Sequence, residues 1–431
     1  MKVVICAYDR PNYVGGPHAW LRRIAPALRE RGVQVRVLFF MTGTRNPDEC
    51  PILTELQHAG FDCAAIPLPT YTEQRVRWIL QQVQSDPPDV FVPNLMAAGF
   101  YAARWVREAG IPTIGTLRSA DPFHAAVLDE FVFGDPRYQL SALVCVSRYL
   151  EHSVLVRNPR GILIRRMPSA VPIPEYATPP PTDTLRLIYV GRLVEEPKRI
   201  SDVTRALCRV VQEVPNTTAA IYGSGPARAD VAALLHTHAQ GLPVKLMGCI
   251  DNAQVQNALL QHHVFVLLSD YEGLSVALME AMACGLVPVC KQMQSSFDEL
   301  ITDGITGIVV QDRGDSFVAA IQRLRNEPQL WGQISTAARE RVQREFAIDI
   351  IADQWLELFT ELSAQASIRR KVVIPRHIEP ALPTLHPALA REDHRTPPLL
   401  KRSYLVVKRI VYRMARAMKR VALTRAARMH T

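Results

Sequence analysis

The sequence predicts an α/β protein of two doubly wound domains, each a parallel sheet covered by helices on both faces. Both halves of the chain alternate short apolar runs with amphipathic helical patterns, which is typical of repeated βα units. Between the halves, six prolines fall within 14 residues from Pro168 to Pro181, and proline continues neither a helix nor a central strand. We therefore expect a first domain over 1–167, an interdomain linker over 168–184 and a second domain over 185–345.

Short apolar runs predict the strands of both domains. In the first domain they lie at 3–6, 33–40, 90–92, 113–116 and 143–146. Helical spacing of apolar residues over 19–30 and 97–108 predicts helices between these strands. The second domain repeats the alternation, with expected strands at 187–190, 219–222, 244–247, 264–268, 287–290 and 308–310. Ligands bind at the carboxyl ends of such strands, so we expect a site in a cleft between the domains.

Three further segments follow the second domain. The pattern from Phe346 to Leu362 predicts an amphipathic helix within 346–367. Residues 368–400 contain six prolines, too many for a packed element, and predict a flexible linker. Residues 401–431 predict a basic amphipathic helix. Its apolar side holds Val407, Val411, Met414, Met418 and Val421, and its opposite side holds Arg409, Arg413, Arg416 and Arg420.

The positive charge of the chain is concentrated in this tail. The net charge is +9, but residues 368–431 hold 16 Lys and Arg against three acidic residues, which leaves residues 1–367 at −4. A basic amphipathic helix beyond a flexible tether is typical of an in-plane anchor, so we interpret 401–431 as binding an anionic membrane surface. Docking on the acidic body or on a partner stays open as an alternative, and no nucleic acid partner is expected.

Cysteine usage and hydropathy predict a cytoplasmic protein. The eight cysteines include no CxxC pair and no metal-like histidine spacing, which predicts reduced thiols and no metal site. The apolar run from Met1 to Ala7 is too short for a signal peptide, and no stretch approaches 18 apolar residues. With the basic tail, these features predict peripheral attachment at the inner face of the cytoplasmic membrane.

The most informative stretch is EGLSVALMEAMACGLVPV, in which an apolar strand runs through an acidic loop into a helix. Free N–H groups of Gly273, Leu274 and Ser275 at the start of that helix predict an anion site. Glu272 in the loop and Glu280 within the helix flank it, and carboxylates accept hydrogen bonds from sugar hydroxyls. A nucleotide sugar suits this arrangement, whereas the alternative is a capped surface helix with solvated glutamates.

This stretch, with GRLVEEPK, IYGSGP and ITDGITGIVV, resembles GT-B glycosyltransferase family 4 over most of the second half. The resemblance implies two Rossmann-like domains that face each other across a cleft. It also implies transfer of a sugar from a nucleotide diphosphate donor with retained anomeric configuration, and requires no metal or other cofactor. The acceptor would be a glycan or a lipid-linked sugar. In this fold the helix within 346–367 returns to pack on the first domain.

The family pattern assigns roles to residues of the second domain. Arg192 and Lys198 would clamp the donor diphosphate and stabilise the charge that develops on it. The resemblance implies that Glu272 positions the donor sugar and that Glu280 accepts from the ribose hydroxyls. The base would lie beside the backbone of Cys249 and Ile250, which leaves uracil, guanine and adenine open.

The family pattern also bears on two regions of the first domain and on a glycine turn of the second. In the first domain Gly15 and Gly16 open onto a helix amino terminus, so donor phosphate or acceptor can approach closely. Where relatives carry a histidine, this chain has Arg118, which either reads an anionic group on a substrate or pairs with Asp121. Gly223 forms a tight turn that shapes the cleft.

Three other activities are compatible with these features. A nucleotide-sugar epimerase or a phosphorylase could use a similar two-domain scaffold. A non-catalytic sugar-binding scaffold protein would carry the same groove without transferring anything.

Overall fold

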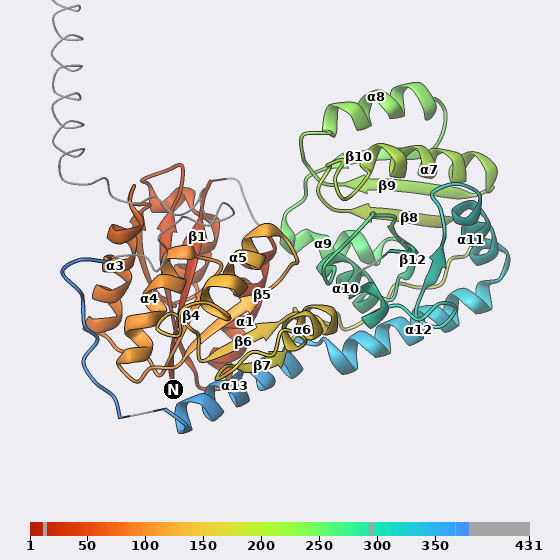
Figure 1. Ribbon diagram of the computed structural model, residues 1–431. Coiled ribbons are helices and arrows are strands. Elements are labelled where there is room, and N and C mark those ends of the chain that lie inside the picture. The colour runs from red at the N-terminus through yellow and green to blue at the C-terminus, as the bar shows by residue number, and fades with distance from the viewer. Residues whose placement is uncertain (12–14, 294–295, 367, 379–431) are drawn as a thin grey trace, which may run out of the picture.

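The computed structural model describes residues 1–378 apart from 12–14, 294–295 and 367, and shows two lobes joined side by side (Figure 1). The described residues of the first lobe form a seven-stranded parallel sheet in the order β3-β2-β1-β4-β5-β6-β7. Its strands are β1 (Lys2–Asp9), β2 (Gln34–Met41), β3 (Asp62–Pro67), β4 (Val90–Asn94), β5 (Thr113–Leu117), β6 (Ala142–Cys145) and β7 (Leu163–Arg166). Its helices are α1 (Gly16–Glu30), α2 (Pro51–His58), α3 (Thr72–Ser85), α4 (Ala97–Glu108), α5 (Pro122–Phe131) and α6 (Arg148–Leu155).

The second lobe repeats this architecture with a six-stranded parallel sheet in the order β10-β9-β8-β11-β12-β13. Its strands are β8 (Leu185–Val190), β9 (Thr217–Tyr222), β10 (Val244–Gly248), β11 (Val264–Leu267), β12 (Val287–Lys291) and β13 (Ile308–Val310). Its helices are α7 (Ile200–Glu213), α8 (Arg228–His238), α9 (Asn252–Leu260), α10 (Val276–Ala283), α11 (Asp315–Asn326) and α12 (Pro328–Glu345). Both lobes are therefore Rossmann-like, which confirms the predicted fold class.

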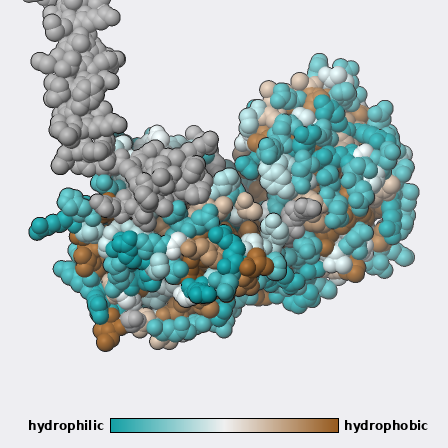
Figure 2. Space-filling model, in the orientation of Figure 1, coloured by the Kyte–Doolittle hydropathy of each residue, from teal (hydrophilic) through white to brown (hydrophobic). Residues whose placement is uncertain are grey.

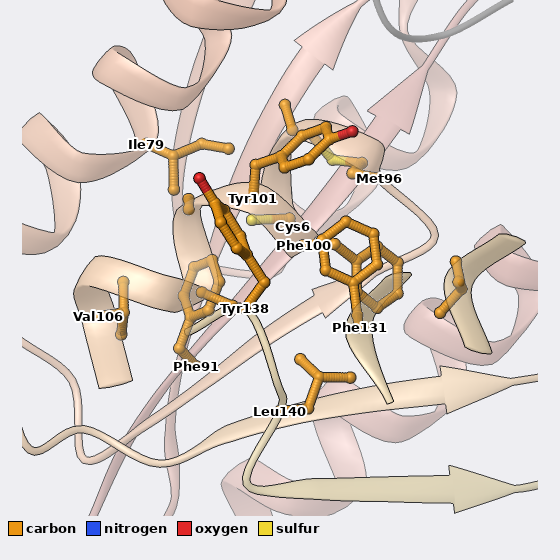
Figure 3. Close-up of a cluster of buried hydrophobic side chains, with 14 of the residues drawn as sticks. Cys6, Ile79, Phe91, Met96, Phe100, Tyr101, Val106, Phe131, Tyr138 and Leu140 are labelled. Atoms are coloured by element: carbon orange, nitrogen blue, oxygen red, sulfur yellow. The ribbon is translucent and has the colours of Figure 1, made fainter. Parts of the chain in front are cut away.

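Apolar side chains cover both faces of each sheet. In β1, Val4 and Cys6 join one core of the first lobe while Val3 and Ile5 join the other, because successive strand residues point to opposite faces. Aromatic rings fill the first of these cores, where Phe100 stacks on Phe131 with 5.2 Å between ring centroids (Figure 3). A parallel sheet buried on both faces reads as continuous apolar runs, which is why the sequence reveals its central strands.

Two strands of the first sheet escaped the sequence analysis. β3 and β7 lie at the two edges of the sheet and are only partly buried. The sequence of β7, LIRR, places two arginines in the strand, and that of β3, DCAAIP, begins with an aspartate. An edge strand packs less apolar surface, so it carries a weaker hydrophobic signal.

Helix α13 (Ile348–Ala364) returns from the second lobe to the first and packs along α1 (Figure 1). Trp355 meets Trp20 of α1 with 5.6 Å between ring centroids, and Phe359 lies beside Trp355 at 5.5 Å. Buried apolar residues of α13, such as Ile351 and Leu358, belong to the same core as β1. The helix thereby returns the chain from the second lobe to the core of the first.

Residues 368–378, the first part of the predicted flexible linker, are packed against the first lobe. Val372 and Ile378 are 2% and 3% exposed and join a core of the first lobe. Backbone groups hold the segment in place, since Arg370 N–H donates to the carbonyl of Ala109 at 2.9 Å and Gln84 donates to the carbonyl of Val372 at 2.6 Å. A high proline content predicts that a segment forms no helix or strand. It does not exclude packing, because the side chains of an irregular segment can still be buried.

This packing predicts different effects at two adjacent valines. Val372→Asp should lower the free energy of unfolding by about 2 to 4 kcal/mol, because it buries an unpaired carboxylate in an apolar core. Val373→Asp, at a side chain that is 63% exposed, should change it by less than about 0.5 kcal/mol. Thermal and urea unfolding of the two variants measure the difference, and equal stability would contradict the packed position of Val372.

The predicted anchor, 401–431, lies outside the described residues, as does 379–400 of the predicted linker. Among the helices that the structure describes, none is both long and apolar enough to cross a bilayer.

Candidate functional site

Each sheet has one point where the strand order reverses. In the first sheet this switch point lies between β1 and β4, and in the second between β8 and β11. Loops that leave the carboxyl ends of two such strands diverge to opposite faces of the sheet and open a crevice in which ligands bind. The loops after β8 and β11 carry Arg192, Lys198, Glu272 and Gly273. Four of the predicted site residues therefore belong to one crevice.

Lys198 and Glu272 form an ion pair in this crevice. Their side chains are 13% and 12% exposed, so the pair is largely shielded from water. The two loops are also joined through the backbone, because Asp270 N–H donates to the carbonyl of Pro197 at 3.0 Å. The structure thus brings the predicted diphosphate clamp and the predicted sugar-positioning carboxylate into direct contact.

Arg192 is exposed beside this pair. Its carbonyl accepts a hydrogen bond from the Tyr189 hydroxyl at 2.9 Å, which fixes the backbone at the end of β8. Within the described part of the chain its guanidinium forms no ion pair. Arg192 is therefore held at its backbone and available at its side chain.

Gly223 lets the loops after β8, β9 and β10 pack together. Its N–H donates to the carbonyl of Gly248 at 2.8 Å, and a Cβ added to it would lie 1.9 Å from the carbonyl oxygen of Gly191. Only glycine permits this approach, which supports the predicted cleft-shaping role by geometry. The turn also places the predicted base-binding backbone beside the crevice, with Cys249 exposed and Ile250 partly buried.

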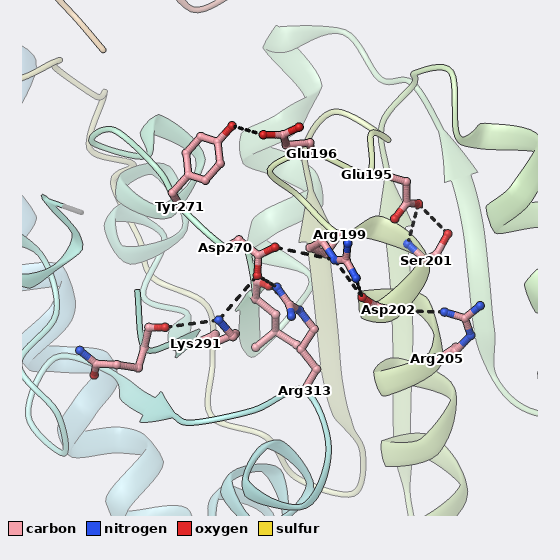
Figure 4. A network of polar contacts seen from close by, with 12 residues as sticks. Glu195, Glu196, Arg199, Ser201, Asp202, Arg205, Asp270, Tyr271, Lys291 and Arg313 are labelled. Atoms are coloured by element: carbon pink, nitrogen blue, oxygen red, sulfur yellow. Dashed lines mark hydrogen bonds and ion pairs between the residues drawn. The ribbon is translucent and has the colours of Figure 1, made fainter. Parts of the chain in front are cut away.

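Asp270 holds a cluster of cations next to the crevice (Figure 4). It pairs with Arg313, with Lys291 at 3.6 Å and with Arg199 at 3.7 Å. Hydrogen bonding from Arg313 lowers the pKa of Asp270, so the carboxylate stays charged and neutralises part of this positive field. The sequence analysis did not single out Asp270, because the residues around it in the sequence do not show which cations it contacts in the fold.

Helix α10 begins at the acidic loop, as predicted. The Ser275 hydroxyl caps it by accepting from the N–H of Leu278 at 3.4 Å, and the side chain of Leu274 is buried among apolar neighbours. Glu280, in the second turn of the helix, pairs with Arg23 of α1 in the other lobe. Arg23 also donates to the carbonyl of Ala170 at 3.2 Å. Glu280, which we predicted to accept hydrogen bonds from the ribose, is therefore ion-paired to Arg23, a residue that the sequence analysis did not identify.

Arg23 and Glu280 line a cavity of about 500 Å³ where the two lobes meet. Figure 2 shows a notch between the lobes, with mostly hydrophilic residues on the visible face of the second lobe. Besides this pair, the cavity wall includes Glu55 of α2 and Asp251 before α9. Charged groups from both lobes thus line one cavity.

Arg118, at the end of β5, does not pair with Asp121. Its guanidinium lies over the ring of Trp20, 4.4 Å from the ring centroid, and burial lowers the pKa of Arg118 to about 9. Asp121 instead caps α5 and accepts from both the N–H and the ring of His124, at 3.0 and 2.9 Å. Of the two interpretations of Arg118, the ion pair is absent from the structure, and the reading of an anionic substrate group stays a prediction.

The carboxyl edges of the two sheets meet at this point. A Cβ added to Gly273 would lie 3.3 Å from the carbonyl oxygen of Arg118, so the acidic loop of the second lobe touches the first lobe. The loop at Gly273 therefore lies at the junction of the two lobes.

The glycine loop of the first lobe is ordered by His18. Gly15 N–H donates to Nδ1 of His18 at 3.1 Å, and Nε2 of the same ring lies 2.7 Å from the carbonyl of Tyr8. This pattern gives His18 a structural task. A Cβ added to Gly16 would meet no heavy atom of the described residues within 4 Å, so a ligand can approach this glycine without displacing them.

The structure groups the candidate residues in two neighbouring places. The loops after β8 and β11 hold Arg192, the Lys198–Glu272 pair and the start of α10, and the Arg23–Glu280 pair lines the cavity between the lobes. The described residues hold no cluster of three or more histidine, cysteine or acidic side chains that would suit a metal ion.

Comparison with known families decides the class of protein. The family described as glycosyl transferases group 1 matches residues 176–341, and the glycosyl transferase 4-like domain matches residues 15–157. The chain belongs to the group 1 glycosyltransferases. Its fold is GT-B, as expected: the Anabaena protein HepE, solved in complex with UDP, superposes with a TM-score of 0.66 at 18% identity. That superposition covers 84% of this chain and 100% of HepE.

Curated relatives match this glycosyltransferase over part of their length. An exopolysaccharide phosphotransferase of Streptomyces coelicolor is 27% identical over 52% of this chain and 23% of the relative. The GPI3 subunit of the phosphatidylinositol N-acetylglucosaminyltransferase of Saccharomyces cerevisiae is 22% identical over 53% of this chain and 52% of the relative. The matches thus span about half or less of these relatives.

Proposed function

We propose that this glycosyltransferase is a retaining, family 4 enzyme that moves a hexosyl group from a nucleotide diphosphate sugar to a glycan or lipid-linked acceptor. Cell-surface polysaccharide or glycolipid synthesis is the proposed setting. The contact of Lys198 with Glu272, beside exposed Arg192 and the start of α10, is the observation that carries this proposal. It supports the proposal because a cation suited to phosphate and a carboxylate suited to sugar hydroxyls adjoin at the carboxyl ends of β8 and β11.

The two cations act on the leaving group. Cleavage of the sugar–phosphate bond adds negative charge to the diphosphate, and Arg192 and Lys198 stabilise that charge more than the ground state. Each charge-assisted contact contributes about 1.5 to 3 kcal/mol. N–H groups at the start of α10 add to this field. Protein cations fill the role of a counter-ion here, so the proposal requires no metal or other cofactor.

The two carboxylates position the donor. Glu272 accepts from hydroxyls of the sugar and Glu280 from those of the ribose. Glu272 is ion-paired to Lys198, which lowers its nucleophilicity and favours a positioning role over attack on the anomeric carbon. Retention then follows from assistance by the leaving phosphate to the incoming hydroxyl on the same face of the sugar.

Nucleotide binding tests the proposal, with UDP as the first probe because HepE was solved with it. At about 100 times its Kd, a ligand that binds only the folded state adds about 2.7 kcal/mol of stability, so UDP should raise Tm. Glu280→Gln should reduce this shift through loss of charge-assisted bonds, whereas Glu357→Gln, at an exposed position on α13, should leave it unchanged. GDP and ADP extend the panel, and no shift with any of the three would reject the proposal.

Product analysis separates the alternative activities. A transferase consumes nucleotide sugar in proportion to the acceptor supplied. An epimerase would yield an altered nucleotide sugar without acceptor, a phosphorylase would require inorganic phosphate, and a scaffold protein would form no product.

We further propose that residues 401–431 attach the enzyme to an anionic membrane at the cytoplasmic face, which suits a lipid-linked acceptor. Because residues 368–378 pack on the first lobe, the matched comparison is a chain that ends at residue 378. The full chain should sediment with vesicles that contain phosphatidylglycerol, and the shortened chain should stay in the supernatant with its Tm unchanged. Equal sedimentation of both chains would exclude the tail as the anchor.

A further inference from the structure

Arg118, which follows β5, is a cation without a counter-ion in the described part of the chain. Its side chain is partly buried, its Nε is buried and donates to no described atom, and it forms no ion pair there. Burial lowers the pKa of Arg118, and no described carboxylate opposes that shift. The ring of Trp20 supports the guanidinium but carries no net charge. The charge of Arg118 is therefore uncompensated among the described residues.

Two carboxylates near Arg118 have other partners. Asp121, three positions further along the chain, caps α5 and accepts from His124. Glu272, across the junction of the lobes, pairs with Lys198. A partly buried cation costs free energy unless an anion meets it. An anionic group on a bound ligand would supply the counter-ion that these carboxylates do not.

Arg118 adjoins the loop that would hold the donor sugar. Its carbonyl oxygen lies 3.3 Å from a Cβ added to Gly273, and Gly273 follows Glu272, which we propose to position that sugar. The diphosphate has cations of its own in the proposed mechanism, since Arg192 and Lys198 follow β8 in the second lobe. Arg118 comes to the junction from the first lobe. A group on the sugar is therefore favoured over the diphosphate as its partner.

We infer that the donor sugar is a hexuronate, whose carboxylate pairs with Arg118. This inference rests on the proposed transferase function and names the class of sugar. A neutral hexose presents only hydroxyls and would leave the guanidinium without a counter-ion. A carboxylate accepts two parallel hydrogen bonds from the planar guanidinium, and contact with the Trp20 ring restricts that plane.

Isothermal titration calorimetry with the full-length chain tests the inference. The ligands are UDP, UDP-glucose with UDP-glucuronate, and UDP-galactose with UDP-galacturonate. At least one uronate should bind about tenfold more tightly than its neutral counterpart, as expected for one added charge-assisted contact. If GDP or ADP gives a larger thermal shift than UDP, the same sugar pairs are carried on that nucleotide.

Variants locate the preference at Arg118. Arg118→Gln removes the charge and should abolish the preference while the affinity for UDP stays unchanged, which also shows that the variant is folded. Arg118→Lys keeps the charge without the planar fork and should retain part of the preference. Arg29→Gln provides the matched control, because Arg29 also lies over an aromatic ring, that of Phe61, but in the last turn of α1. It should preserve the full preference.

Three results would overturn the inference. The first is equal binding of the uronate and the neutral sugar within both pairs, and the second is a preference that survives Arg118→Gln. The third is an equal loss of affinity for UDP and for the uronate in Arg118→Gln, which would assign Arg118 to the diphosphate. Failure of every nucleotide to bind would instead count against the proposed function.

Discussion

Arg192→Ala is expected to lower kcat for sugar transfer by about 10²- to 10³-fold, the usual loss when one donor to a developing oxyanion is removed. The guanidinium is exposed and forms no ion pair within the described chain, so it has no structural partner to lose. We therefore expect Tm to stay within about 1 °C of the native value, since surface changes of this kind cost less than about 0.5 kcal/mol. Steady-state kinetics with the nucleotide sugar that gives the largest thermal shift measures the effect.

Two further variants test whether the effect depends on the shape of the guanidinium and on its position. Arg192→Lys keeps the charge but loses the planar two-pronged donor, so its kcat should fall between those of the native enzyme and Arg192→Ala. Arg205→Ala removes an arginine of α7 that is 54% exposed and pairs with Asp202, and it should leave kcat unchanged. If Arg192→Ala changed KM alone, Arg192 would bind ground state and transition state equally and the proposed role would be wrong.

Gly223→Ala is expected to lower the free energy of unfolding by about 2 to 4 kcal/mol and to reduce activity together with stability. The added Cβ would lie 1.9 Å from the carbonyl oxygen of Gly191, so the loop after β8 must move. That loop carries Arg192, which is why the displacement should also reach the site. Urea unfolding and transfer assays on the same preparation measure both effects.

Gly332→Ala provides the matched control. Gly332 lies inside α12, and no described atom stands within 4 Å of an added Cβ. Alanine there should stabilise the helix by about 0.5 to 1 kcal/mol without changing activity. If Gly223→Ala left the free energy of unfolding unchanged or raised it, as expected for Gly332→Ala, the loops would not pack as closely as the structure shows.

The crevice at the carboxyl ends of β8 and β11 was largely predictable because each of its two loops can be recognised from a short stretch of sequence. Glu272, Gly273 and Ser275 stand where an apolar strand turns into a helix, and parallel-sheet geometry alone sends that turn to a ligand-binding edge. Lys198 follows the preceding strand of the crevice by the same logic. Whether each residue performs its assigned role remains a prediction for the experiments above.

The partners of these residues were not predictable. Arg23 meets Glu280 across 257 positions of chain, and no pattern within either helix signals the contact. The packed segment 368–378 escaped for a related reason: its burial comes from individual side chains such as Val372, without a helical or strand period to reveal it.

By itself, the sequence determined the two doubly wound domains and which residues follow the carboxyl ends of their central strands, because hydrophobic periodicity shows where each buried strand begins and ends. Only the tertiary structure decided which charges meet. The docking of the lobes sets the Arg23–Glu280 pair, and the strand order of the second sheet brings Lys198 and Glu272 together at the carboxyl ends of β8 and β11. Strand order and lobe docking depend on contacts between residues that are distant in sequence. The spacing of apolar residues within one helix or strand does not reveal such contacts.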